Sequence, residues 1–185
     1  ISVAFGIGAI ALAVAHFVVP PGVVLNILLP TILALVSVCL IIWAACRRAQ
    51  YPVPVAMLGF IGFSGLLLTS WATLALHSLN LQSFLFCLMF ASLFATGAYC
   101  LWNGALQNTA NRFLFWVFTA IAIQLVFAPL TTFYDNAVIT SEDFQTSFYW
   151  LVFNFVVVVS SIWVAATLLL GCISDVFCAN ELASD

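Results

Sequence analysis

The chain has 185 residues, of which 66% are hydrophobic and 5% are charged. Three arginines, no lysine and six acidic residues give a net charge of −3. This composition excludes a water-soluble globule, a disordered chain and a nucleic-acid-binding protein, which would need a basic surface. We therefore expect the lipid bilayer to be the solvent for most of the chain.

Apolar windows long enough to cross a membrane follow one another along the chain, since about 20 residues suffice for one crossing. The breaks between them are short and hold proline, arginine or polar residues, so neighbouring helices are expected to be antiparallel. The fold class predicted is an all-α, polytopic membrane protein, a six-helix up-down bundle. The windows are Ile1–Val19, Val23–Cys46, Val53–Leu76, Phe84–Leu106, Phe113–Phe133 and Phe148–Ile173, with connections at 20–22, 47–52, 77–83, 107–112 and 134–147.

The arginines predict the orientation of the bundle. Arg47 and Arg48 follow the second window and Arg112 follows the fourth, so all three lie on one side if six helices alternate. The positive-inside rule then places both termini in the cytoplasm. The acidic connection at 134–147 falls on the outer side.

Small residues within the third window predict close helix packing. Gly59, Gly62 and Gly65 are expected to line one side of that helix and to let another helix backbone approach. Five of the six cysteines lie in apolar runs, and none forms a CxxC pair, so they are interpreted as buried thiols that act as small hydrophobic side chains. These five are Cys39, Cys46, Cys87, Cys100 and Cys172.

Chemistry-bearing residues are scarce. No charged residue falls in a predicted membrane core, and neither an HExxH nor a GxSxG motif is present, so no catalytic residue is assigned within this chain. His16 and His77 are expected near the outer face, where two imidazoles at one depth can ligate haem or a transition metal. The alternative is that both are interfacial side chains without a common ligand.

Two amides are expected in the middle of the bundle. Gln124 and Asn154 need hydrogen-bond partners in lipid, because an unsatisfied amide is costly there. They are interpreted either as inter-helix hydrogen-bonding groups or as the lining of a polar ligand pocket. The phenylalanines of the fifth window suit an apolar or lipid pocket and suit core packing equally.

The last window continues into a polar tail. No proline or glycine follows Gly171, so one helix from about Glu142 to Ala183 would measure about 60 Å, twice the thickness of the hydrocarbon layer. We expect a sensory membrane domain at 1–173 and, at 174–185, the start of a cytoplasmic signalling helix. A short coiled-coil seam is predicted there, which favours a homodimer, and an ordinary frayed tail is the alternative. The seam residues are Leu169, Ile173, Val176, Asn180 and Ala183.

The layout resembles that of MASE-type integral membrane sensory domains, which precede bacterial GGDEF diguanylate cyclases. Six apolar helices with short loops are followed by Glu181-Leu182-Ala183-Ser184-Asp185, which is similar to the stretch before such a cyclase domain. The resemblance implies a sensor in a bacterial inner membrane that controls cyclic di-GMP synthesis by an attached domain. A histidine-kinase sensor would have much the same layout. It carries over no functional residue.

The sequence therefore favours a membrane-embedded input domain. A small-molecule, lipid or metal ligand would shift the last helix and so change the activity of an output domain. Two other classes stay open. One is a small transporter or channel-like protein, and the other is a haem-binding membrane oxidoreductase.

Overall fold

A computed structural model describes residues 23–76, 79–105 and 109–134, together with Ile7, Ile10 and the positions 155, 158–159, 162–167, 169–171 and 173. Four long helices make up most of the described part, and it contains no strand. The predicted all-α class is confirmed for these residues. The helices are α2 (Val23–Arg48), α3 (Val55–Leu74), α4 (Leu79–Ala105) and α5 (Thr109–Tyr134).

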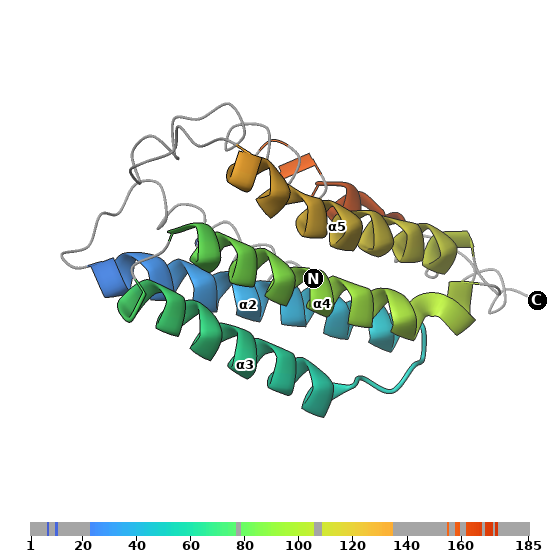
Figure 1. The fold of residues 1–185 in the computed structure, drawn as a ribbon. Helices are drawn as coiled ribbons and strands as arrows, with labels where there is room; N and C mark the ends of the chain where they lie inside the picture. Colours follow the sequence, from blue (N-terminus) through green and yellow to red (C-terminus); the bar gives the residue numbers. More distant parts are fainter. Residues whose placement is uncertain are drawn as a thin grey trace, which may run out of the picture.

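The four helices lie side by side and alternate in direction (Figure 1). α4 is the central helix, since it packs against α2, α3 and α5. Its side chains Leu93 and Leu101 are fully buried, as are Ile42 of α2 and Phe118 of α5. The helical residues between 155 and 171 run alongside α5 (Figure 1). The predicted up-down order is therefore observed from α2 to α5.

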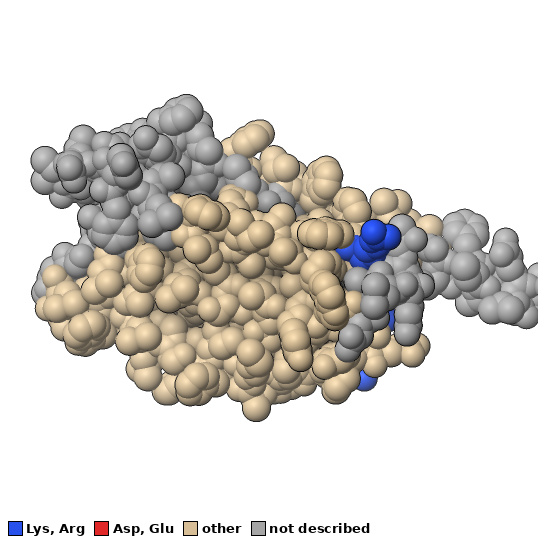
Figure 2. Space-filling view, turned by 45° about the vertical axis from the view of Figure 1, so that its right-hand side comes forward, with Lys and Arg blue, Asp and Glu red and all other residues tan. Residues whose placement is uncertain are grey.

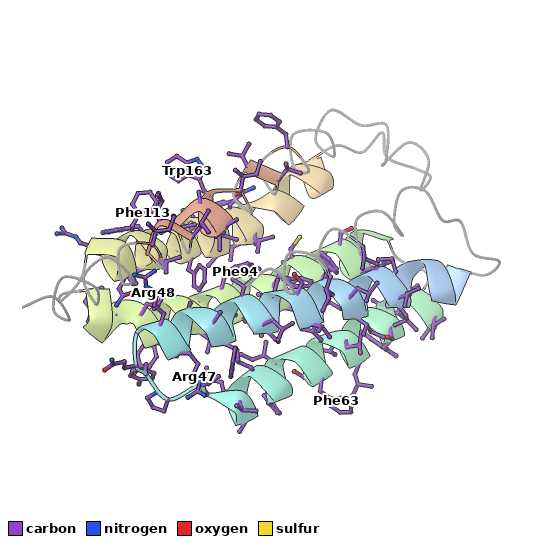
Figure 3. The ribbon with its side chains drawn as sticks, turned by 180° about the vertical axis from the view of Figure 1, so that it is seen from behind. Arg47, Arg48, Phe63, Phe94, Phe113 and Trp163 are labelled. Atoms are coloured by element: carbon purple, nitrogen blue, oxygen red, sulfur yellow. The ribbon has the colours of Figure 1, made fainter. Side chains whose placement is uncertain are left out.

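Three helices are long and apolar enough to cross a membrane: Leu28–Arg48, Val55–Leu74 and Leu81–Trp102. Shorter apolar stretches occur at Asn111–Phe127 and Ile162–Gly171. The outer face of α3 exposes Phe60, Phe63 and Trp71, and Figure 3 shows Phe63 pointing away from the bundle. Large exposed aromatic side chains are costly in water and favourable against lipid. These helices are suited to membrane insertion, whereas most of the first predicted window lies outside the described residues.

Two predicted helix starts are wrong. α4 begins at Leu79 rather than Phe84, and α5 begins at Thr109 rather than Phe113. Hydropathy placed both starts too late because the first turns hold polar residues such as Asn80 and Asn111. These residues lower the hydropathy of a window, but neither stretch contains the proline or glycine that would stop a helix.

The end of α2 is closed by a Schellman motif. The Tyr51 amide donates to the Cys46 carbonyl at 3.0 Å, and the Gln50 amide donates to the Arg47 carbonyl at 3.2 Å. Gln50 has a φ of 56°, the left-handed conformation that this motif requires and that glycine usually supplies. The motif turns the chain sharply, so α3 can start at Val55 and pack against α2.

The glycines of α3 differ in their surroundings. Gly62 and Gly65 are buried, and a Cβ on Gly65 would meet Met89 Sδ of α4 at 2.5 Å. Gly59 is exposed, with nothing within 4 Å of an added Cβ. The predicted packing face is therefore confirmed for Gly62 and Gly65, and Gly59 does not belong to it.

Candidate functional site

The structure places only part of the predicted site. His16, His77 and Asn154 lie outside the described residues, and their predicted roles stay predictions. Gln124 is half-buried on α5. Within the described ranges, no three His, Cys, Asp or Glu side chains lie close enough together to hold a metal ion.

The predicted signalling helix is described over its first part. Leu169 and Ile173 are helical and exposed, so both are accessible to a neighbouring chain or to lipid. Val176, Asn180 and Ala183 lie outside the described residues. The coiled-coil seam therefore stays a prediction.

The arginines gather at one end of the molecule (Figure 2). Arg47 is exposed, and its guanidinium lies 5.6 Å from the ring centroid of Trp43, a cation–π contact. Arg112 is also exposed, in the first turn of α5. Arg48 points to the other side of α2 from Arg47, toward α5 and the final helical segment (Figure 3). Among the described residues, the three arginines therefore form a charged rim at this end of the bundle.

Arg48 lies directly against Gly171. A Cβ added to Gly171 would overlap the Arg48 guanidinium, with Nη1 and Cζ as the nearest atoms. Gly171 is buried, and it is the last residue of the apolar stretch that begins at Ile162. Only glycine lets the arginine side chain cross the final helix so closely. This contact joins the end of α2 to a segment that is remote in sequence.

A second contact fixes the same segment to α5. The Phe113 and Trp163 rings stack with centroids 5.5 Å apart and an interplanar angle of 25° (Figure 3). Val164 and Thr167 of that segment are buried, and the Thr167 hydroxyl donates to the Trp163 carbonyl at 2.7 Å. The final helix therefore packs against the bundle along one face between Trp163 and Gly171.

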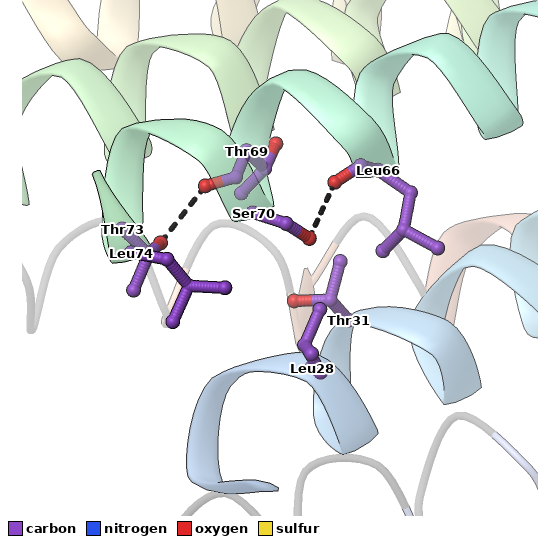
Figure 4. A pocket seen from close by; sticks show the side chains of 7 residues that line it. All are labelled: Leu28, Thr31, Leu66, Thr69, Ser70, Thr73 and Leu74. Carbon is purple, nitrogen blue, oxygen red and sulfur yellow. Dashed lines mark hydrogen bonds between the residues drawn. The ribbon is translucent and has the colours of Figure 1, made fainter. Parts of the chain in front are cut away.

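A small cavity lies between α2 and α3 (Figure 4). Its volume of about 10 Å³ is close to the space that one water molecule needs. The Ser70 hydroxyl donates to the Leu66 carbonyl at 2.7 Å, and the Thr73 hydroxyl donates to the Thr69 carbonyl at 2.8 Å. Because these bonds lie within one helix, the hydroxyls need no ligand, and the cavity is too small for an organic molecule.

A larger groove lies between α4 and α5, with a volume of about 340 Å³. One helical stripe of α4 forms one wall, and it consists of Ala95, Ala98, Tyr99 and Trp102. A matching stripe of α5 forms the other wall, and it consists of Phe115, Thr119, Ala122 and Ile123.

Buried alanines form the floor of the groove, and aromatic rings form part of its walls. Ala98 and Ala122 are buried, whereas Tyr99 is 74% exposed. Trp102 and Phe115 meet edge to face at 5.2 Å and join the two helices at the end nearest to the arginines. Gln124 is not among the lining residues, so the predicted polar pocket is not what this groove provides.

Two cysteines come together across the helices. The thiols of Cys46 in α2 and Cys100 in α4 face each other, and both residues are buried. Cys87 is also buried and Cys39 is half-buried, and all four are free thiols. They behave as the predicted small hydrophobic side chains, and the pair ties α2 to α4.

Family models, curated proteins and solved structures offer no guide to this site, since searches of all three found no match to the chain. Sequence reasoning missed the Arg48–Gly171 contact and the groove between α4 and α5. The sequence does contain a glycine late in the last window and a stripe of alanine and aromatic residues in the fourth window. Neither pattern, however, indicates which other helix it contacts.

Proposed function

We propose that this chain is a membrane-embedded sensory input domain, whose final helix transmits a signal to a cytoplasmic output domain. In keeping with the resemblance to MASE-type domains, the output is a diguanylate cyclase that makes cyclic di-GMP. The chain lies in a bacterial plasma membrane with its arginine end in the cytoplasm, and it acts as a homodimer joined through the final helix.

The observation that supports this proposal most is the contact between Arg48 and Gly171. A signalling helix must respond to the bundle, which requires a contact that differs between two arrangements. The Arg48 side chain crosses the final helix at a single glycine, at the end of the bundle where that helix would leave the membrane. A small shift of α2 or of the final helix would therefore change this contact.

The stacked Phe113 and Trp163 rings also support a coupling between the bundle and the final helix. They hold the final helix to α5 about two turns before Gly171, so the helix has one contact with α5 and another with the end of α2. A ligand that changes the spacing of these helices would tilt or slide the final helix. Such a ligand must bind the two arrangements with different affinity.

The test uses the full-length protein and measures its output, which is cyclic di-GMP formation under this proposal. Gly171→Ala is expected to change the basal output severalfold, because the added methyl overlaps the Arg48 guanidinium. The control is Gly59→Ala, where an added Cβ meets nothing within 4 Å. Arg48→Ala combined with Gly171→Ala is expected to restore the output toward that of Arg48→Ala alone. If Gly171→Ala leaves the output of a folded, membrane-inserted protein unchanged, as the control Gly59→Ala is expected to do, the final helix does not carry the signal.

A further inference from the structure

We infer that the groove between α4 and α5 binds one anionic phospholipid, with an acyl chain in the groove and the phosphate beside Arg112. This inference does not depend on the proposed function, because such a site would exist whether or not the final helix transmits a signal. It rests on the shape of the groove, on the position of Arg112 and on the start of α5.

The shape of the groove suits an acyl chain. Its α5 wall runs from Phe115 to Ile123, a separation of eight residues, which is about 12 Å at 1.5 Å per residue. The walls are alanine and aromatic side chains, and the Thr119 hydroxyl is already bonded to the Phe115 carbonyl at 2.8 Å. The groove therefore offers a largely apolar surface along the helix axis, which a flexible hydrocarbon chain can cover.

Arg112 precedes the groove by about one turn, on the same face of α5 as the groove wall. Arg112, Phe115, Thr119 and Ala122 follow three-four-three spacing, so they share one face of α5 and the arginine extends the α5 wall by about one turn. Arg112 is exposed, and Trp102 on the opposite wall is the last residue of the α4 membrane span. The cation is therefore expected at the depth of the lipid headgroups, about one helical turn beyond the end of the groove.

The start of α5 adds a second positive field at the same place. The first turn of α5 contains Arg112 and no acidic residue. The amide dipoles of a helix make its first turn positive, so an arginine there is not compensated by its own helix. A phosphate beside Arg112 would receive both contributions. Hydrocarbon binding alone would not discriminate between lipids, and this charge is what selects an anionic headgroup.

The test measures lipid retained by the full chain in native mass spectrometry, after purification with phosphatidylglycerol or phosphatidylcholine of identical acyl chains. One arginine at a membrane surface corresponds to about a fivefold preference for the anionic lipid. Arg112→Gln is expected to abolish that preference, whereas Arg47→Gln at the same end of the bundle is expected to keep it. Ala95→Leu fills the groove from an exposed lining position and is expected to reduce the retention of both lipids. The matched control is Ala120→Leu, an exposed alanine of α5 outside the groove.

Three results would overturn the inference. The wild-type chain could retain both lipids equally. Arg47→Gln could lower the preference as much as Arg112→Gln does, which would indicate general surface charge. Ala95→Leu could leave lipid retention intact and instead convert a dimer into a monomer in sedimentation, which would make the groove a contact between two copies of the chain. Because Arg112 is exposed, its variant tests the site even if Ala95→Leu does not fold.

Discussion

The guanidinium of Arg48 lies against the backbone of Gly171, so the end of α2 is in contact with the final helical segment. The two residues are remote in sequence, and glycine is the only residue that leaves room for this contact. Replacing Gly171 therefore tests whether the final helix is an integral part of the bundle.

Gly171→Ala is expected to lower the stability of the bundle. The added methyl must displace the Arg48 side chain or push the helices apart, and overpacking of this kind costs about 1–3 kcal/mol. Thermal melting in detergent, followed by tryptophan fluorescence, measures the change. Arg48→Ala in the same chain should recover much of the loss, since it removes the group that collides. An unchanged melting temperature for Gly171→Ala would mean that Arg48 does not occupy this position.

Gly65→Ala is expected to destabilise the contact between α3 and α4. Its Cβ would meet Met89 Sδ at 2.5 Å and Met89 Cβ at 2.8 Å. The thioether can move, but the Met89 Cβ is fixed to the backbone of α4, so the two helices must separate slightly. We expect a loss of about 1–3 kcal/mol.

Gly59→Ala provides the matched control on the same helix. Its Cβ meets nothing within 4 Å, so its stability should be equal to or slightly above that of the wild-type chain. Equal melting temperatures for the Gly65 and Gly59 variants would contradict the close approach of α3 to α4.

Gln50→Gly is expected to stabilise the protein. Gln50 has a φ of 56°, a left-handed conformation that costs a residue with a Cβ about 1 kcal/mol. Glycine keeps the backbone hydrogen bonds of the Schellman motif and removes this cost. Gln50→Ala is the control, because alanine loses the side chain without gaining conformational freedom. A lower melting temperature for Gln50→Gly than for Gln50→Ala would show that this turn is not left-handed.

The orientation of the bundle is tested by reporter insertion at its two ends. Green fluorescent protein inserted after Gln50 should fluoresce, because the arginine end is expected in the cytoplasm. Alkaline phosphatase fused after Leu76, at the opposite end, should be active because that enzyme matures outside the cytoplasm. The two fusions exchanged between the sites should both be inactive. The reverse pattern would place the arginine end outside.

The sequence predicted those features that depend on local hydropathy. The window Val23–Cys46 differs from α2 by two residues, because the helix includes both arginines in its last turn, where cations are favourable. The gathering of Arg47, Arg48 and Arg112 at one end also followed from alternation of the helices. By contrast, the first turn of α4 is polar, so a hydropathy criterion did not assign the first five residues of this helix.

Contacts between helices could not be read from the sequence, because nearly all faces of these helices are apolar. The hydrophobic period that normally marks the buried side of a helix is therefore absent. Nothing in the sequence distinguishes Gly59 from Gly65, yet only Gly65 meets another helix. The Arg48–Gly171 and Cys46–Cys100 contacts likewise depend on how α2 is rotated about its axis, which only tertiary packing determines.

The sensory role is tested most directly by reading the native coding frame beyond Asp185. We expect a helical linker followed by a signalling output domain, and a GGDEF cyclase would agree with the resemblance in full. A frame that encodes no output domain after Asp185 would contradict the sensory role. The Arg48–Gly171 contact would then be a packing feature, and transport or redox chemistry would have to be tested in its place.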